Sequence, residues 1–267
     1  MKTVGNILAL LVACLFALTW GLLLRERIGM STGPTVVPKY EELLSEGEDR
    51  RDARMGIYLG PQRIGETQTT VERSTFGSFY VRSLTRVEIK DLPAYMFRTV
   101  GDVTIEFFAD ISPLTGLRSI QVTCPRLDVR LIGTVREGQL VMRGVMAGER
   151  ITKSIPFMGG PFLGEAFTPM AGLPDLKRAR KGDRWTMLLV NPIVGSVQAI
   201  RVTVEDRRIV GRGADKCTLL RLGFNSGSQV WQSWVTAEGD VMVQGTPLGL
   251  TLRREDMPQA VRDAIGL

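Results

Sequence analysis

The sequence predicts a mainly β protein: a large curved antiparallel sheet (a half-barrel or open barrel) with a short inserted helical lid, preceded by one transmembrane helix. Three observations lead there: an apolar run near the amino terminus, two-residue alternation of apolar and polar residues from Arg54 onward, and one apolar segment broken by Gly and Pro. We expect four regions, namely an anchor over 1–27 (helix 4–24), a linker over 28–53, the β domain over 54–255 and a short helix over 256–267.

The apolar run Val4–Leu24 sets the expected location of the rest of the chain. It carries no charge, and Arg25 and Arg27 end it. A bilayer-spanning helix needs about 20 mostly apolar residues. We therefore expect an uncleaved, single-pass membrane anchor.

Two alternatives to an uncleaved anchor stay open. The run can be a cleaved leader, although it has no clear small-residue cleavage site. It can also be processed as a lipoprotein, because the residues up to Cys14 fit a lipid-attachment pattern. Orientation is open too, since Lys2 is outnumbered by Arg25 and Arg27 beyond the run, which by charge alone favours a cytoplasmic domain. We favour an extracytoplasmic domain, on the periplasmic side of the inner membrane, because short amino-terminal anchors commonly leave their amino terminus inside.

Alternation predicts the strands of the β domain. Val103, Ile105 and Phe107 alternate with polar residues, and so do the apolar residues of 127–136 and of 200–204. Glu137-Gly138 is typical of a hairpin turn. We count about eleven strands joined mostly by short turns, with no βαβ rhythm.

The segment Pro156–Pro174 interrupts the alternation and is the best candidate ligand site. Its Gly and Pro residues argue against a regular strand and allow at most a short helix near Gly164–Ala171. Its large apolar side chains are soft enough to line an irregular apolar site or lid. The alternative is a plug that completes the core. The candidate ligand-binding residues are Phe157, Met158, Phe162, Leu163, Phe167 and Met170.

The tail and two tryptophans complete the structural expectations. Asp256 followed by Pro258 is a helix-start signal, so we expect a short terminal helix. Trp231 and Trp234 lie an odd number of residues apart on one predicted strand, so their side chains should point to opposite faces.

Composition excludes several classes of site. The chain contains no histidine, which rules out Ser-His-Asp and Cys-His catalysis and His-ligated metals. Ser154 beside Lys153 does not serve as a dyad, because neighbours on a strand face opposite ways. We therefore expect no enzyme, no cofactor and no metal, with a histidine-free hydrolase as the minor alternative. Cys124 and Cys217 fall in predicted strands, and pairing or two free thiols both stay open.

The net charge is +6, and the densest basic patch is the stretch from Lys177 to Arg184. A solvated loop and a contact with anionic lipid or nucleic acid are the two interpretations. We expect no nucleic-acid partner, because Trp185 is the only aromatic residue beside the patch.

Three stretches carry a family resemblance: MGIYLGPQRIGETQTTV (Met55–Val71), LKRARKGDRW (Leu176–Trp185) and WVTAEGDVMVQGTPLGLTLRR (Trp234–Arg254). In this order they resemble the exported β domains that precede transglutaminase-like peptidase domains in many bacteria. Those domains in turn look like relatives of lipoprotein-carrier half-barrels, whose curved sheet wraps around helical segments and can hold acyl chains. The resemblance implies a fold more than an activity. Without histidine the chain carries no Cys-His-Asp set, so we expect the β domain to stand alone on its anchor.

Two functional hypotheses follow. The first is a non-catalytic, membrane-anchored extracytoplasmic β domain that binds a lipid or other apolar ligand in the concavity of its sheet. The second is a protein-interaction or scaffold module for a separately encoded envelope enzyme, with a filled core and no ligand. Partners would accordingly be the membrane through 4–24, an apolar small molecule, or an envelope protein.

Overall fold

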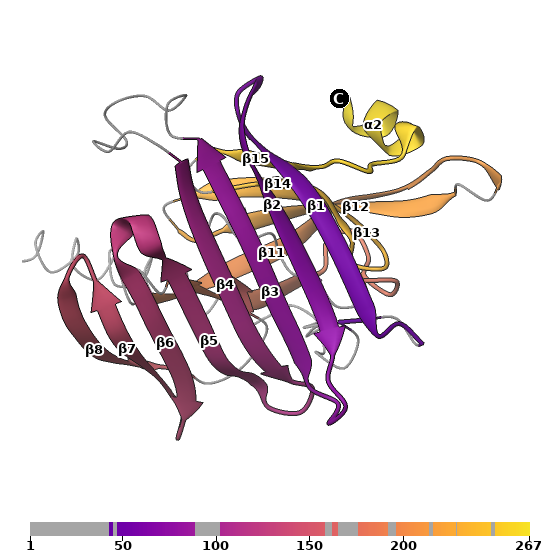
Figure 1. The fold of residues 1–267 in the computed structure, drawn as a ribbon. Helices are drawn as coiled ribbons and strands as arrows, with labels where there is room; N and C mark the ends of the chain where they lie inside the picture. The colour runs from indigo at the N-terminus through magenta and orange to yellow at the C-terminus, as the bar shows by residue number, and fades with distance from the viewer. Residues whose placement is uncertain are drawn as a thin grey trace, which may run out of the picture. The chain divides into compact units, whose positions relative to one another are not determined.

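The computed structural model describes residues 43–44, 47–88, 102–157, 162–164, 176–191, 196–213, 216–227, 229–246 and 249–267. The chain divides into two units, Met1–Thr35 and Val36–Leu267, and the second holds every described strand. Figure 1 shows the ribbon of the chain. The strands are β1 (Arg50–Leu59), β2 (Gln62–Arg73), β3 (Phe79–Glu88), β4 (Asp102–Ser112), β5 (Gly116–Cys124), β6 (Val129–Arg136), β7 (Gln139–Met146), β8 (Glu149–Pro156), β9 (Phe162–Gly164), β10 (Arg184–Asn191), β11 (Ser196–Val210), β12 (Cys217–Asn225), β13 (Val230–Thr236), β14 (Val241–Gly245) and β15 (Thr251–Arg254).

All fifteen described strands belong to one sheet in the order β8-β7-β6-β5-β4-β3-β2-β1-β15-β14-β13-β12-β11-β10-β9. Neighbours pair antiparallel except β9 and β10, which run parallel. The sheet is not closed, because β8 and β9 are its two edges. The strand β8 nevertheless contacts β11, far from it in the strand order, so the sheet curls. The expected open antiparallel sheet is confirmed apart from the parallel pair.

Strands with clear alternation lie where the sequence predicts them. The expected strands over 103–107, 127–136 and 200–204 correspond to β4, β6 and β11, although β6 starts at Val129 because residues 125–127 form a 3-10 turn (η3, Pro125–Leu127). Glu137 and Gly138 turn β6 into β7 with φ values of 49° and 73°. Positive φ at both central residues suits a tight hairpin turn, which explains the Glu-Gly pair.

The β domain begins earlier than expected. The strand β1 starts at Arg50, and its residues pair with β2 from Arg50↔Glu72 onward. Leu43 and Leu44 are buried in a core cluster. The polar stretch that suggests a linker over 28–53 therefore includes part of a strand. Arg50 and Asp52 form an ion pair with each other, and such a pair suits the exposed face of a strand. Residues 28–42 of the expected linker lie outside the described residues.

The terminal helix is confirmed, but its start differs. It is α2, Gln259–Ile265, with Pro258 at the N-cap and no side-chain cap. Asp256 does not cap it, because its carboxylate accepts a 2.7 Å hydrogen bond from Arg254 Nε. Val261 of α2 packs with residues of β11, β12 and β14 in a small apolar cluster.

The predicted anchor over 4–24 lies outside the described residues. Within the described part of the chain, no helix is long and apolar enough to cross a membrane. Most of the segment Pro156–Pro174 is outside it as well, including the helix expected near Gly164–Ala171. Phe162–Gly164 forms β9, so the expectation that this segment contains no strand is wrong at these three residues, whose backbone pairs with β10.

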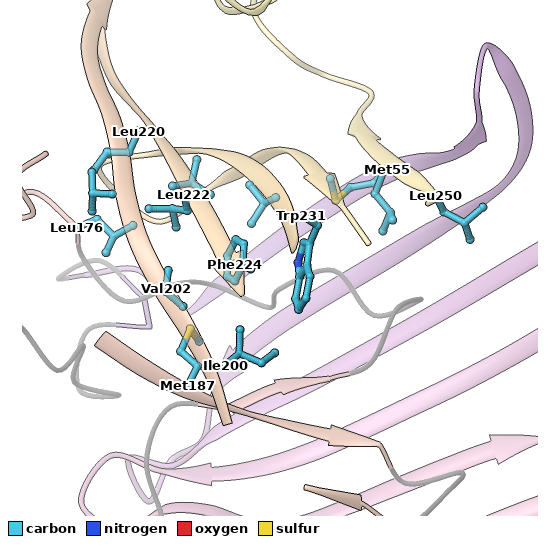
Figure 2. Packing of buried hydrophobic residues seen from close by; sticks show 14 of the residues in the cluster. Met55, Leu176, Met187, Ile200, Val202, Leu220, Leu222, Phe224, Trp231 and Leu250 are labelled. Carbon is cyan, nitrogen blue, oxygen red and sulfur yellow. The ribbon is translucent and has the colours of Figure 1, made fainter. Parts of the chain in front are cut away.

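Two large apolar clusters lie on the sheet. The first, which we call the β10–β15 core, joins residues of β1–β3 with residues of β10–β15. Figure 2 shows side chains of this cluster, with the rings of Phe224 and Trp231 face to face. The second, the β2–β8 core, contains Val71, Phe79 and Phe107 with apolar residues of β5–β8. Together they identify one continuous buried side of the sheet.

Candidate functional site

The inward face of β2–β8 is a broad apolar surface. Strand alternation places every second side chain there, and the register aligns them in rows across the strands. One row contains Phe107, Val122 and Leu131, which pair in that order. Further buried members of this face are Val81, Ala109, Ile111, Leu117, Ile120, Leu140, Met142 and Ile155. Such a surface can desolvate an acyl chain.

Four hydroxyls interrupt this apolar face. Thr67 and Thr69 of β2 stand opposite Thr85 and Ser83 of β3. We call these four residues the hydroxyl cluster; each has a relative exposure of 2% or less. The register places the cluster between the two cores, because Thr67 pairs with Met55 on one side and Ser83 with Phe107 on the other.

The hydroxyls bond to one another and leave one hydrogen over. Thr69 donates to Ser83 over 3.1 Å, and Thr85 donates to Thr67 over 2.9 Å. Thr67 and Ser83 are 3.2 Å apart, and either can be the donor. Three bonds use three of the four hydroxyl hydrogens. The fourth hydrogen belongs to Thr67 or Ser83, whichever of the two accepts the central bond. In the described part of the chain, none of these bonds provides an acceptor for that hydrogen.

Two further polar groups of the β10–β15 core are buried without a partner in the described residues. They are Ser233 Oγ and Trp185 Nε1. Ser233 pairs with Leu222 and Gln244, so it lies in an inward row. A buried polar group without a hydrogen bond costs roughly 1–3 kcal/mol. A bound polar atom at the inward face would recover part of this cost.

A charged network ties the start of β1 to the β13–β14 turn. Arg51 contacts Glu48 over 2.6 Å and Asp240 over 3.9 Å, while Arg254 contacts Asp240 over 3.1 Å. Burial by itself lowers the pKa of Arg51, but the hydrogen bond to Glu48 and the charge of Asp240 raise it above the usual value. The hydrogen bond from Arg254 lowers the pKa of Asp256. Each charge of the network contacts at least one charge of the opposite sign.

The sequence-predicted ligand residues are only partly described. Phe157 is 1% exposed, belongs to the β2–β8 core, and donates its backbone N–H to Gly138 over 2.7 Å. Phe162 and Leu163 lie in β9, where their backbones pair with Leu188 and Leu189 of β10. Met158, Phe167 and Met170 lie outside the described residues. The structure thus places Phe157 on the apolar face of β2–β8.

The two tryptophans face opposite ways, as predicted. Trp231 lies in the β10–β15 core, stacked on Phe224 with centroids 5.5 Å apart and an interplanar angle of 8°. Trp234 packs near α2, with the guanidinium of Arg208 4.4 Å from its ring centroid. Trp231 is therefore the core residue, and Trp234 is held by cation–π contact on the outer side.

The two cysteines do not form a disulfide, and the basic loop is held by hydrogen bonds from Arg207. Cys124 and Cys217 are both free, in different apolar clusters. Burial raises the pKa of the Cys217 thiol, aided by Glu238. The loop at 177–183 is fixed by Arg207, which donates to the carbonyl oxygens of Ala179 and Lys177. Among the described residues, no group of three or more His, Cys, Asp or Glu is arranged to hold a metal ion.

Sequence reasoning missed the hydroxyl cluster. A signal for it exists, because Thr67 and Thr69 share the phase of Val71, and Ser83 and Thr85 share that of Val81. Polar residues at inward positions are the informative exception to alternation. To recognise them, one must know which residues of β2 and β3 face inward, and the apolar residues of these two strands define that poorly.

Comparisons with known proteins complete the description. No protein-family model matches the chain, and no curated protein matches it significantly. Among solved structures, the chain is similar to the crystal structure of a β-barrel-like protein of domain of unknown function DUF1849 from Brucella abortus, with 11% sequence identity and a TM-score of 0.46. The match covers 82% of this chain and 95% of that one. The fold and site described above define the class: a β domain built on one open, curled sheet.

Proposed function

We propose that this domain binds an acyl-chain ligand on the inward face of its sheet, with the ligand's carbonyl or carboxylate oxygen at the hydroxyl cluster. The observation that carries the proposal is the unspent hydroxyl hydrogen of the Thr67–Ser83 pair, buried within an apolar face. Ligand sites in proteins combine mostly apolar walls with a few well-placed polar groups.

The division of labour follows from position. The apolar rows of β4–β7 would receive the hydrocarbon chain, since they contain most of the buried apolar side chains on that side of the cluster. The hydroxyl cluster would fix the head of the ligand, because an oxygen acceptor there satisfies the remaining donor. The segment Pro156–Pro174 would act as a lid next to Phe157. Anchoring through residues 4–24, with the domain outside the cytoplasm, belongs to the same proposal.

A scaffold role for a separately encoded envelope enzyme is the second candidate. It is favoured by the β10–β15 core, where the stacked pair Phe224 and Trp231 fills the interior. In that case the β2–β8 core would be filled as well and no ligand would bind.

The test is a pair of titrations on the fragment Val36–Leu267, after cooperative urea unfolding has shown that it folds. Palmitate and hexadecane share an apolar chain, but palmitate alone has an oxygen acceptor. The variant that lacks all four hydroxyls (Thr67→Val, Thr69→Val, Ser83→Ala and Thr85→Val) leaves no hydroxyl donor at this site. It should weaken palmitate binding by about two- to tenfold and leave hexadecane binding unchanged, because one hydrogen bond contributes about 0.5–1.5 kcal/mol.

Thr104→Val is the matched control, since Thr104 lies on β4 and pairs with Arg86 on the outward face. It should change neither titration. If wild type binds neither ligand, the scaffold hypothesis replaces this one. If the variant without the four hydroxyls weakens both ligands equally, the head-group role of the hydroxyl cluster is wrong.

A further inference from the structure

The outward face of β6, β7 and β8 carries a cluster of arginines around one apolar residue. Arg130 of β6 and Arg150 of β8 both pair with Val145 of β7, from opposite sides. Arg143 lies two residues from Val145 on β7, so its side chain shares this face. All three arginines are exposed. With strands about 4.8 Å apart, Arg130 and Arg150 start about 10 Å from each other.

These positive charges are not neutralised locally. Arg130, Arg143 and Arg150 form no ion pair with any carboxylate in the described part of the chain. The contrast is with Arg50, Arg63 and Arg254, which each contact two carboxylates. The only acid in β6–β8 is Glu149, which pairs with Met146 and so has the inward phase. The face is therefore a one-sign surface.

An apolar groove lies within the same face. It has a volume of about 430 Å³, and Ile132 beside it is 57% exposed. Ile132 pairs with Arg143, so this exposed apolar side chain lies on the same face as the arginine cluster, directly across from Arg143. The lining residues are Ile132, Thr134, Arg136, Val141, Arg143 and Gly144.

We propose that the outward face of β6–β8 docks on an anionic lipid surface. Guanidinium groups spaced several ångströms apart around an apolar centre match many separate head-group anions better than a single anion. Ile132 and Val141 would contact the acyl boundary while the arginines stay at the head groups. This docking does not depend on ligand binding at the inward face, so the two proposals can fail separately.

Other polyanions fit the same face less well. Single-stranded nucleic acid requires aromatic side chains for base stacking, and β6–β8 contain none. An acidic protein would neutralise the arginines, but its charged surface would not fill the apolar groove around Ile132. The basic loop at 177–183 lacks the apolar centre, and its Asp183 adds a negative charge.

The test is arginine footprinting on the full chain with a dicarbonyl reagent, read by mass spectrometry. The chain is mixed with vesicles of phosphatidylcholine alone, or of phosphatidylcholine and phosphatidylglycerol at a 7:3 ratio. With the anionic vesicles, modification of Arg130, Arg143 and Arg150 should slow severalfold, and added salt should remove this protection. Arg178, on the loop, should react at the same rate with both vesicles.

A variant sharpens the result. Arg143→Gln should weaken the protection of Arg130 and Arg150 about fivefold, the contribution of one basic residue at an anionic surface. Arg178→Gln removes the same charge from the loop and should have no effect. Equal modification rates with both vesicles overturn the proposal. Protection by soluble polyglutamate but not by anionic vesicles also overturns it, in favour of an acidic protein partner.

Discussion

The hydroxyl oxygens of Thr67 and Ser83 lie 3.2 Å apart on neighbouring strands, at the boundary between the two cores. Each also accepts a hydrogen bond from a second buried threonine, Thr85 for Thr67 and Thr69 for Ser83. The pair is therefore the centre of a polar network in an otherwise apolar inward face. Its role in stability can be separated from its role in binding.

Removing Ser83 should cost more than removing Thr69. Ser83→Ala leaves the buried donor of Thr69 without an acceptor, so we expect a loss of about 1–3 kcal/mol in the free energy of unfolding. Thr69→Val removes only a donor and keeps the Thr67–Ser83 bond, and should cost less. Urea unfolding of the two variants measures the difference, with exposed Thr152→Val as the neutral control. Equal losses would show that the network does not couple these residues.

The stacked pair Phe224 and Trp231 should dominate the stability of the β10–β15 core. Trp231 is 8% exposed, so Trp231→Ala opens a large cavity and should cost about 3–5 kcal/mol. Phe76→Ala removes an aromatic side chain that is 92% exposed and should change stability by less than about 0.5 kcal/mol. A small effect of Trp231→Ala in chemical denaturation would mean that this half of the core is loosely packed.

Gly65 should tolerate a methyl group less well than Gly133. A Cβ at Gly65 would lie 2.2 Å from the backbone oxygen of Arg86, which cannot move without disturbing the β2–β3 ladder. A Cβ at Gly133 would meet side-chain atoms of Met142, Ile120 and Leu140, which can adjust. Gly65→Ala should therefore cost at least about 1–3 kcal/mol, and Gly133→Ala less. Thermal unfolding of both variants decides this, and the reverse order contradicts it.

The Arg254–Asp256 pair should make stability fall at low pH. Because its pKa is lowered in the folded chain, Asp256 contributes stability that is present above its unfolded pKa near 3.9 and is lost as the pH falls through the folded pKa. The side chain of Asp256 is 68% exposed, so the contribution should be about 0.2–1 kcal/mol. The gap in stability between wild type and Asp256→Asn should hold at neutral pH and shrink below about pH 4. Asp49→Asn, an exposed acid on the chain before β1, is the control; a gap independent of pH would assign the effect to something other than this charge.

The alternation of apolar and polar residues was sufficient to predict strands that have one buried and one solvent-exposed face. In β4 and β6, apolar residues such as Val103 and Leu131 occupy every second position. The Glu137-Gly138 pair, which has positive φ in the structure, predicts the hairpin turn after β6. The shortest strands, β9 and β15, have too few residues for a period to show. The parallel pairing of β9 with β10 depends on contacts distant in sequence, which no local pattern encodes.

The two proposed binding surfaces depend on strand register, and this is why the sequence did not reveal them. Thr67 and Ser83 are polar residues in inward positions, which only their cross-strand partners expose as a cluster. Arg130 and Arg150 are distant in sequence and meet on one face only because both pair with Val145. The apolar segment Pro156–Pro174, by contrast, stands out in composition alone. Of its six candidate ligand residues, Phe157 is the one whose side chain lies in the described part of the chain.

The measurement that tests the central claim most directly is a ligand census. Val36–Leu267, once shown to unfold cooperatively, is expressed with export to a bacterial periplasm, purified without detergent, and examined by native mass spectrometry and by organic extraction. We predict a near-stoichiometric lipid or fatty acid in the wild-type fragment, and much less of it in the variant without the four hydroxyls of the cluster than in the control Thr104→Val. A clean ligand-free mass for the folded fragment, with no uptake of added palmitate, would contradict it.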